Sequence, residues 1–452
     1  MAAALAVVAG ALLLAWPALL NGYPLVFSDT GGFLHQTLGP LMLWDKPWVY
    51  GPLLHAFHWR ATLWLPLAGQ ALLVSAMLWL VQRVLRGAPG HAGAATPGAH
   101  LAVCVVAATL TTAPFTVALL MPDVLTAPMV LALGLLGFAR ERLSGREAAW
   151  LVLVATLGIA AHLSHVPIGL ALALLPLLAL RVRGALLAGL PLVLGVALVV
   201  GTNAVGHGRA ALSPHGATFL LARLQADGPA ARVIQARCPD AGWYLCAFAD
   251  RLPMDANDFL WEADSPVNRA PDGTPRFLGG AMLSPEAGVI VGETLRAEPI
   301  AVARAVLHNT VMQLLTAGIG DTLGPENLAA ALHPRIAEGF PARETAAFEA
   351  SLQMRGELRA AVAPLALLHA LVLLATLPVL LAAGWRTWRA GDAVRVGLLA
   401  AVLVGVVGNA AATGGLSGVF PRYQARIAWL LPVVALLLLL LPQRPAGREA
   451  GA

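Results

Sequence analysis

The chain has 452 residues, of which 58% are hydrophobic and only 12% charged, and its mean hydropathy is +0.75. An ordinary soluble domain carries about 25% charged residues, so this composition excludes a soluble protein and predicts an all-α polytopic membrane protein. The net charge of +5 comes from arginines that cluster in short loops, with Lys46 as the single lysine, and it does not indicate nucleic-acid binding.

Apolar stretches long enough to cross a bilayer recur along the chain and predict about ten transmembrane helices. They cover residues 3–20, 63–82, 100–120, 124–139, 149–163, 167–180, 185–204, 362–384, 395–412 and 428–442. The first stretch has no basic region before it, so a retained span is expected rather than a cleaved signal peptide. The stretch 149–180 is divided at Pro167, because proline favours the first turn of a new helix; one long kinked helix with a re-entrant piece is the alternative.

The arginines between these spans predict the orientation of the chain. With the N-terminus inside, the inner segments carry twelve basic residues against four acidic ones. The basic residues are Arg83, Arg86, Arg140, Arg142, Arg146, Arg181, Arg183, Arg386, Arg389, Arg395, Arg444 and Arg448, and the acidic ones are Glu141, Glu147, Asp392 and Glu449. Arginine in place of lysine is typical of a GC-rich bacterial genome, so the predicted location is a bacterial inner membrane.

This layout divides the chain into an N-terminal membrane module (1–204), a periplasmic region (205–361) and C-terminal membrane helices (362–452). A first outer loop, 21–62, is rich in tryptophan, which suits a helix lying in the headgroup layer.

Two cysteines, Cys238 and Cys246, fall in the periplasmic region, where an oxidising environment would pair them in a disulfide. Two reduced thiols packed beside Trp243 are the alternative. The third cysteine, Cys104, lies inside a predicted span and is expected to be a small buried apolar residue.

Three sets of polar residues reach the same outer membrane face, although they lie far apart in the sequence. The first opens the outer loop with Ser28, Asp29, Thr30 and His35, followed by Asp45 and Lys46. The second is Met121-Pro122-Asp123 at the end of the third span, and the third is Arg422, Tyr423 and Arg426 before the last span. Carboxylates and guanidiniums that converge at one interface indicate an active site more than scattered solvation.

The order of these motifs resembles the GT-C superfamily of integral membrane glycosyltransferases, close to the protein mannosyltransferases and the lipid A aminoarabinose transferase. The matching segments are Tyr23–Gly32, Met121–Pro128 and Arg422–Pro432. The resemblance implies a polyprenyl-phosphate sugar as donor, an extracytoplasmic glycan, lipid or protein as acceptor, and inversion at the anomeric carbon. The chain departs from some relatives because Thr30, and not a second acid, follows Asp29, so the resemblance does not carry over the sugar or the acceptor.

Residue by residue, the resemblance makes Asp29 the general base and Asp123 the second acid, which positions the acceptor or binds a divalent metal ion. Arg422 would hold the lipid phosphate, with Tyr423 donating a further hydrogen bond. Arg426, Lys46 and His35 complete the expected substrate-binding set.

Each of these residues also has a structural interpretation. Asp29 and Asp123 would serve as helix N-caps, Arg422 and Arg426 as arginines that reach the headgroups, and Lys46 as an exposed loop residue. The pair His162 and His165 is expected to be a polar helix end, with metal binding as the alternative.

Two other functions stay open. The chain would be a secondary transporter or flippase if a polar path reached the cytoplasmic side, or a noncatalytic envelope assembly factor if the polar residues were dispersed.

Overall fold

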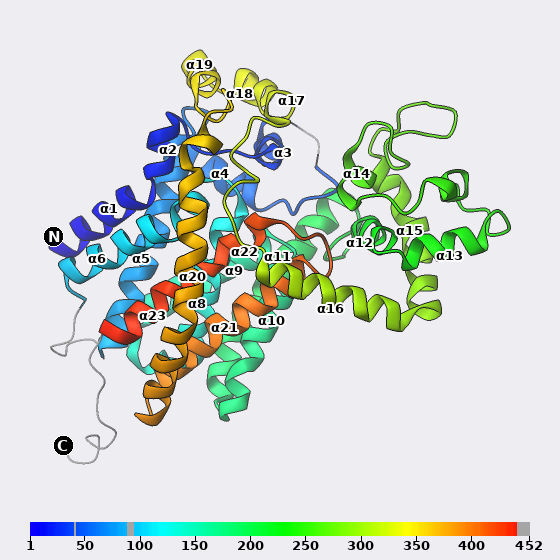
Figure 1. The fold of residues 1–452 in the computed structure, drawn as a ribbon. Helices are drawn as coiled ribbons and strands as arrows, with labels where there is room; N and C mark the ends of the chain where they lie inside the picture. The colour runs from blue at the N-terminus through cyan, green and yellow to red at the C-terminus, as the bar shows by residue number, and fades with distance from the viewer. Residues whose placement is uncertain (40–41, 88–94, 441–452) are drawn as a thin grey trace.

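The computed structural model describes residues 1–39, 42–87 and 95–440, so Arg444 and Arg448 lie outside the described residues. The described chain consists of helices and loops, with two isolated β-bridges in place of strands (Figure 1), and the predicted all-α class is confirmed. The N-terminal part contains α1 (Ala2–Leu14), α2 (Trp16–Asn21), α3 (Ser28–Leu38), α4 (Tyr50–His58), α5 (Trp64–Arg86), α6 (Pro97–Leu110), α7 (Ala113–Ala118), η1 (Pro122–Leu125), α8 (Thr126–Phe138), η2 (Arg140–Arg142), α9 (Gly145–Ala161), α10 (His165–Leu174), η3 (Leu175–Ala179) and α11 (Val182–His207).

The chain then leaves the helical bundle and returns to it. This excursion contains α12 (Gly216–Ala226), α13 (Pro229–Arg237), η4 (Tyr244–Arg251), α14 (Ala256–Trp261), α15 (Gly279–Ala297), α16 (Pro299–Leu315), α17 (Leu328–Ala331), α18 (His333–Gly339) and α19 (Ala342–Ala350). The return is made by α20 (Leu358–Arg389), α21 (Ala393–Thr413), α22 (Pro421–Ala428) and α23 (Leu430–Leu440). We call the end of the bundle from which residues 208–357 emerge the outer face.

Five helical stretches among the described residues are long and apolar enough to cross a membrane, which supports a membrane protein but not the count of ten spans. They are Trp64–Arg86, Val182–His207, Leu358–Arg389, Ala393–Thr413 and Pro421–Leu439. The predicted span 3–20 is divided between α1 and α2, and the span 100–120 between α6 and α7. Pro17 and Pro114 explain both breaks, because proline is accommodated in the first turn of a helix but not in its interior.

The most lipid-like surfaces belong to α11 and α20, in which only 22% and 17% of the apolar stretch is buried inside the protein. The exposed side chains of α20 include Leu367, Leu371, Leu374, Leu377 and Leu381. A surface with this many exposed leucines would aggregate in water, so we assign this surface of α20 to contact with the acyl chains of the membrane.

The excursion 208–357 packs as two separate parts. Helices α12–α15 and the start of α16 surround their own apolar core, which includes Leu221, Phe259 and Ile290. In contrast, α17–α19 add residues such as Leu332 and Phe348 to the main core of the membrane helices. The second part therefore belongs to the main core, whereas the first part touches the first outer loop through Trp44, which stacks on Phe219 at 5.2 Å.

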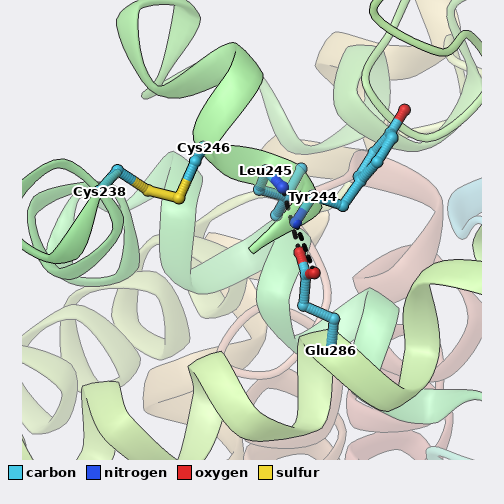
Figure 2. The surroundings of a disulfide bond; sticks show 5 residues. All are labelled: Cys238, Tyr244, Leu245, Cys246 and Glu286. Carbon is cyan, nitrogen blue, oxygen red and sulfur yellow. Dashed lines mark hydrogen bonds between the residues drawn. A yellow bond between two sulfur atoms is a disulfide. The ribbon is translucent and has the colours of Figure 1, made fainter. Parts of the chain in front are cut away.

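A disulfide joins Cys238 to Cys246, as the sequence predicts, while Cys104 is a buried free thiol. Figure 2 shows that the carboxylate of Glu286, from α15, accepts hydrogen bonds from the backbone of Tyr244 (2.7 Å) and Leu245 (3.1 Å) beside this disulfide. These two bonds satisfy donors at the start of η4 and attach the disulfide loop to α15.

Replacing Cys246 by serine should loosen this loop without unfolding the membrane core. The disulfide closes a short loop, eight residues apart in sequence, and loop entropy gives about 2–3 kcal/mol for its loss. We expect amide hydrogen exchange in residues 238–251 to accelerate by up to roughly two orders of magnitude. Cys104→Ser should leave exchange in this segment unchanged; equal protection in Cys246→Ser and wild type would contradict the prediction.

Candidate active site

The first outer loop is fixed against the segment that carries Asp123. Two backbone hydrogen bonds of 3.0 and 2.9 Å join Leu25 to residues 118–120 in a short parallel bridge. The hydroxyl of Thr30 donates to a carbonyl oxygen of the same segment at 3.0 Å. Asp29 lies directly before Thr30, and Asp123 lies three residues after Leu120. These contacts therefore bring the two acidic motifs together although they are far apart in sequence.

A single buried amide fixes a third segment to this pair. The side chain of Gln353 accepts from the Val26 N–H (3.2 Å) and donates to the Val26 carbonyl (2.7 Å) and to the Thr322 carbonyl (2.8 Å). Gln353 is almost fully buried. It therefore holds the first outer loop beside the loop that contains Asp321, which neighbours Thr322.

Asp29 lies in the first turn of α3, with its side chain 34% exposed and one carboxylate oxygen 3.0 Å from the Lys46 ammonium. Burial opposes its ionisation, but the charges of Lys46 and Arg422 outweigh burial and hold the pKa of Asp29 below its ordinary value. Asp29 is therefore an accessible anion at neutral pH. Lys46 also pairs with Asp45, so it lies between two carboxylates rather than in open solvent.

The N-cap interpretation of Asp29 is not what the structure shows. The side chain that accepts from the N-terminal backbone of α3 belongs to Thr30, whose hydroxyl oxygen takes the Phe27 N–H at 3.0 Å. The next residue, Gly31, packs so closely on α17 that an added Cβ would lie 2.1 Å from the Ala331 carbonyl oxygen. Thr30 and Gly31 thus fix the helix start and leave the Asp29 carboxylate uncommitted to capping.

Arg426 and Asp123 form a buried ion pair, with only 1% and 4% of their side chains exposed and 3.3 Å between them. The remaining donors of Arg426 are also used: Nε and Nη2 donate to Asn409 (2.9 and 2.7 Å), and Nη2 donates to Ser164 (2.8 Å). A guanidinium with all these partners is committed to the protein. The geometry therefore favours a positioning role for Arg426 over the substrate-binding role expected from the sequence.

Arg422 lies one helical turn before Arg426 on α22 and has different partners. Its guanidinium stacks on the Phe27 ring at 4.1 Å and lies 4.9 Å from the Tyr423 ring, with one weak hydrogen bond of 3.4 Å to the Tyr423 hydroxyl. Its Nε is buried without a hydrogen-bond partner among the described residues. Stacking on aromatic faces orients the guanidinium fork while its donors stay available for a ligand.

A narrow, partly open pocket with a cavity volume of about 20 Å³ lies beside Arg422 and Arg426 of α22. Its wall includes Asp123, Arg422 and Arg426 together with Thr322 and Phe115. The pocket thus combines charged and apolar side chains, and Asp29 is not among the residues that line it.

Asp321 belongs to this site although its sequence context carries no recognisable motif. One of its carboxylate oxygens accepts the backbone N–H of Arg422 at 3.1 Å, and the other is buried without a partner among the described residues. Burial raises the pKa of Asp321 despite the nearby Arg422. The only signal in the sequence is a single acid in the glycine-rich stretch 318–324, after α16.

Of the other expected residues, His35 does not join the site. It lies further along α3, beside Gly39 and near Arg335 and Glu338 of α18, because two helical turns separate it from Asp29. Tyr423 does lie in the site, through its contact with Arg422.

The histidine pair is a polar helix end. Both ring nitrogens of His165 are used in hydrogen bonds, to the Gly158 carbonyl (2.7 Å) and the Thr126 hydroxyl (2.8 Å), and His162 bonds Ser164 at 2.8 Å. In the described chain, no group of three or more histidine, cysteine or acidic side chains is arranged to hold a metal ion. No step is therefore assigned to a metal ion.

Comparisons of the chain with models of known protein families, with curated proteins and with solved structures gave no match. The glycosyltransferase resemblance therefore stays a prediction that rests on the motifs and on the geometry described above.

Replacing Asp123 by asparagine should destabilise the protein strongly. The substitution leaves the buried Arg426 charge uncompensated, and breaking a buried pair from one side costs about 3–5 kcal/mol. We expect a clearly lower midpoint in denaturant or thermal unfolding in detergent.

A matched control is Glu349→Gln, which breaks the exposed pair with His333 and should change stability by no more than about 0.5 kcal/mol. A midpoint for Asp123→Asn equal to that of the control would mean that the buried pair does not support the fold.

Proposed function

We propose that the protein is an inner-membrane glycosyltransferase of the GT-C type, which transfers one sugar from a polyprenyl-phosphate carrier to a periplasmic glycan, lipid or protein. One observation carries the proposal: the Asp29 carboxylate, accessible and ionised, lies within electrostatic range of Arg422, whose guanidinium is oriented but not consumed by protein partners. A base and an anion-binding group close to each other are the two parts that this transfer requires.

In the proposed reaction, Asp29 removes the proton from an acceptor hydroxyl. The acceptor oxygen attacks the anomeric carbon as the bond from that carbon to the phosphate oxygen breaks, which inverts the configuration. The electron pair of the broken bond leaves with the polyprenyl phosphate, and the proton remains on Asp29 until it passes to solvent. A positioned base of this kind contributes about 10²–10⁴-fold to the rate.

Arg422 stabilises the leaving phosphate, on which negative charge grows during the reaction. Its planar fork matches two phosphate oxygens, and the Phe27 ring keeps the fork in place. Tyr423 adds a hydroxyl donor beside the same guanidinium. Asp123 and Arg426 position α22, which carries Arg422, rather than react themselves.

Replacing Asp29 by asparagine should abolish most glycan transfer while the protein still folds. The amide is isosteric with the carboxylate but cannot accept the proton, so we expect a fall of about 10²–10⁴-fold in transfer of sugar from a lipid-linked donor by purified protein. The exposed Asp272→Asn serves as a control for loss of a carboxylate outside the site. A folded Asp29→Asn variant with wild-type rate would exclude Asp29 as the base.

Replacing Lys46 by glutamine should move the acid limb of the pH–rate profile to higher pH. The pKa of Asp29 is held low partly by Lys46, so loss of this cation raises that pKa, and the active carboxylate is then protonated at a higher pH. The profile of kcat/KM against pH measures the shift.

Asp45→Asn removes an anion from the same lysine and should not move the acid limb upward. Coincident acid limbs for Lys46→Gln and wild type would show that Lys46 does not set the ionisation of the catalytic base.

A further inference from the structure

Helix α16 exposes an apolar face that neither core of the protein covers. Ile300, Leu307, Val311 and Leu315 recur at helical spacing on this face, with Ile300 and Leu315 67% and 77% exposed. The opposite face is buried and partly polar, and includes Asn309 and Gln313. An amphipathic helix whose apolar side is the outward one is not explained by packing within the chain.

The position of α16 indicates what covers this face. The buried side of the helix rests on the end of α21 at the outer face, where Gly414 and Gly415 lie against Asn309 and Thr310. In Figure 1, α16 runs from left to right, whereas the spanning helix α20 runs from top to bottom. Because α21 ends there, α16 lies at the level where a spanning helix leaves the apolar layer.

The charges on the helix agree with a phospholipid surface. The helix Pro299–Leu315 contains no acidic residue, and its exposed side carries one arginine, Arg304, together with His308. An arginine among apolar side chains reaches phosphate groups while its stem stays in the apolar layer.

We infer that α16 is an interfacial helix whose Ile300–Leu315 face lies in the boundary between headgroups and acyl chains of the outer leaflet. Its partner is the phospholipid monolayer, and the inference does not depend on the proposed enzymatic function. The contact anchors the part of the excursion that has its own core, α12–α15, on the membrane surface.

This anchoring reaches the candidate active site through two side chains. The amide of Gln313 donates to the Phe420 carbonyl (2.9 Å) and accepts the Phe420 N–H (3.0 Å), two residues before Arg422. The loop after α16 then supplies Asp321, which accepts the Arg422 backbone N–H. Both ends of the loop between α16 and Asp321 therefore hold the start of α22.

The test is a spin label at Leu307 in the full-length protein, with Cys104→Ala as background and the native disulfide kept. The protein is reconstituted in vesicles of phosphatidylethanolamine and phosphatidylglycerol, and accessibility to oxygen and to a water-soluble nickel chelate is measured. Leu307→Cys is compared with Leu371→Cys on the lipid-facing side of α20 and with Ala346→Cys on the exposed side of α19.

The expected result is high accessibility to oxygen and low accessibility to nickel, as at position 371. Accessibility to nickel as high as at position 346 would place the face in water and overturn the inference. Protection from both reagents would also overturn it, because the face would then be covered by protein, such as a second copy of the chain.

Discussion

The buried guanidinium of Arg426 is the constraint on which the candidate site depends. A charge with only 1% of its side chain exposed must find its partners inside the protein, since the cost of leaving it unpaired is several kcal/mol. Its partners come from three different places: Asp123 before α8, Asn409 on α21 and Ser164 before α10. Satisfying one side chain thus fixes the ends of four helices at the outer face, and with them the walls of the pocket.

Two arginines one turn apart on α22 consequently have different uses. Arg426 is saturated by protein partners, whereas Arg422 is oriented mainly by the faces of aromatic rings and keeps donors unused. A similar division separates the acids, since Asp123 neutralises a buried cation while Asp29 remains accessible beside Lys46. In each pair, the more buried side chain is the one that takes part in the Asp123–Arg426 ion pair. The more exposed one keeps a carboxylate or guanidinium that is not saturated by the described residues.

The sequence predicted the helical membrane class, the disulfide between Cys238 and Cys246, and the grouping of Asp29, Asp123 and Arg422 toward one face, because hydropathy, cysteine placement and sidedness are local signals. The breaks within the first and third spans are marked locally by Pro17 and Pro114 but were not predicted. The partners of Arg426 were not predicted because they depend on packing between distant segments. Gln353 and Asp321 were not predicted as site residues for the same reason. In the sequence, a glutamine and an acid in a polar region are expected to be exposed to solvent, and only the fold gives them partners inside the protein. The sequence places His35 in the site because it lies close to Asp29 along the chain. In the structure, the turns of α3 between the two residues direct His35 toward α18.

The polar links between segments also connect the membrane surface with the pocket. Gln313 holds the Phe420 peptide and Asp321 holds the Arg422 peptide, so the first turn of α22 is bonded to the helix that we place in the headgroup layer and to the loop that follows it. Gln353 ties the Asp321 loop in turn to Val26, close to Asp29. A displacement of α16 relative to the spans would therefore be transmitted both to Arg422 and to the segment that carries Asp29. In the proposed reaction, a lipid-borne donor would reach the site from the membrane plane, and a helix lying in that plane would set the depth at which the donor's phosphate meets Arg422.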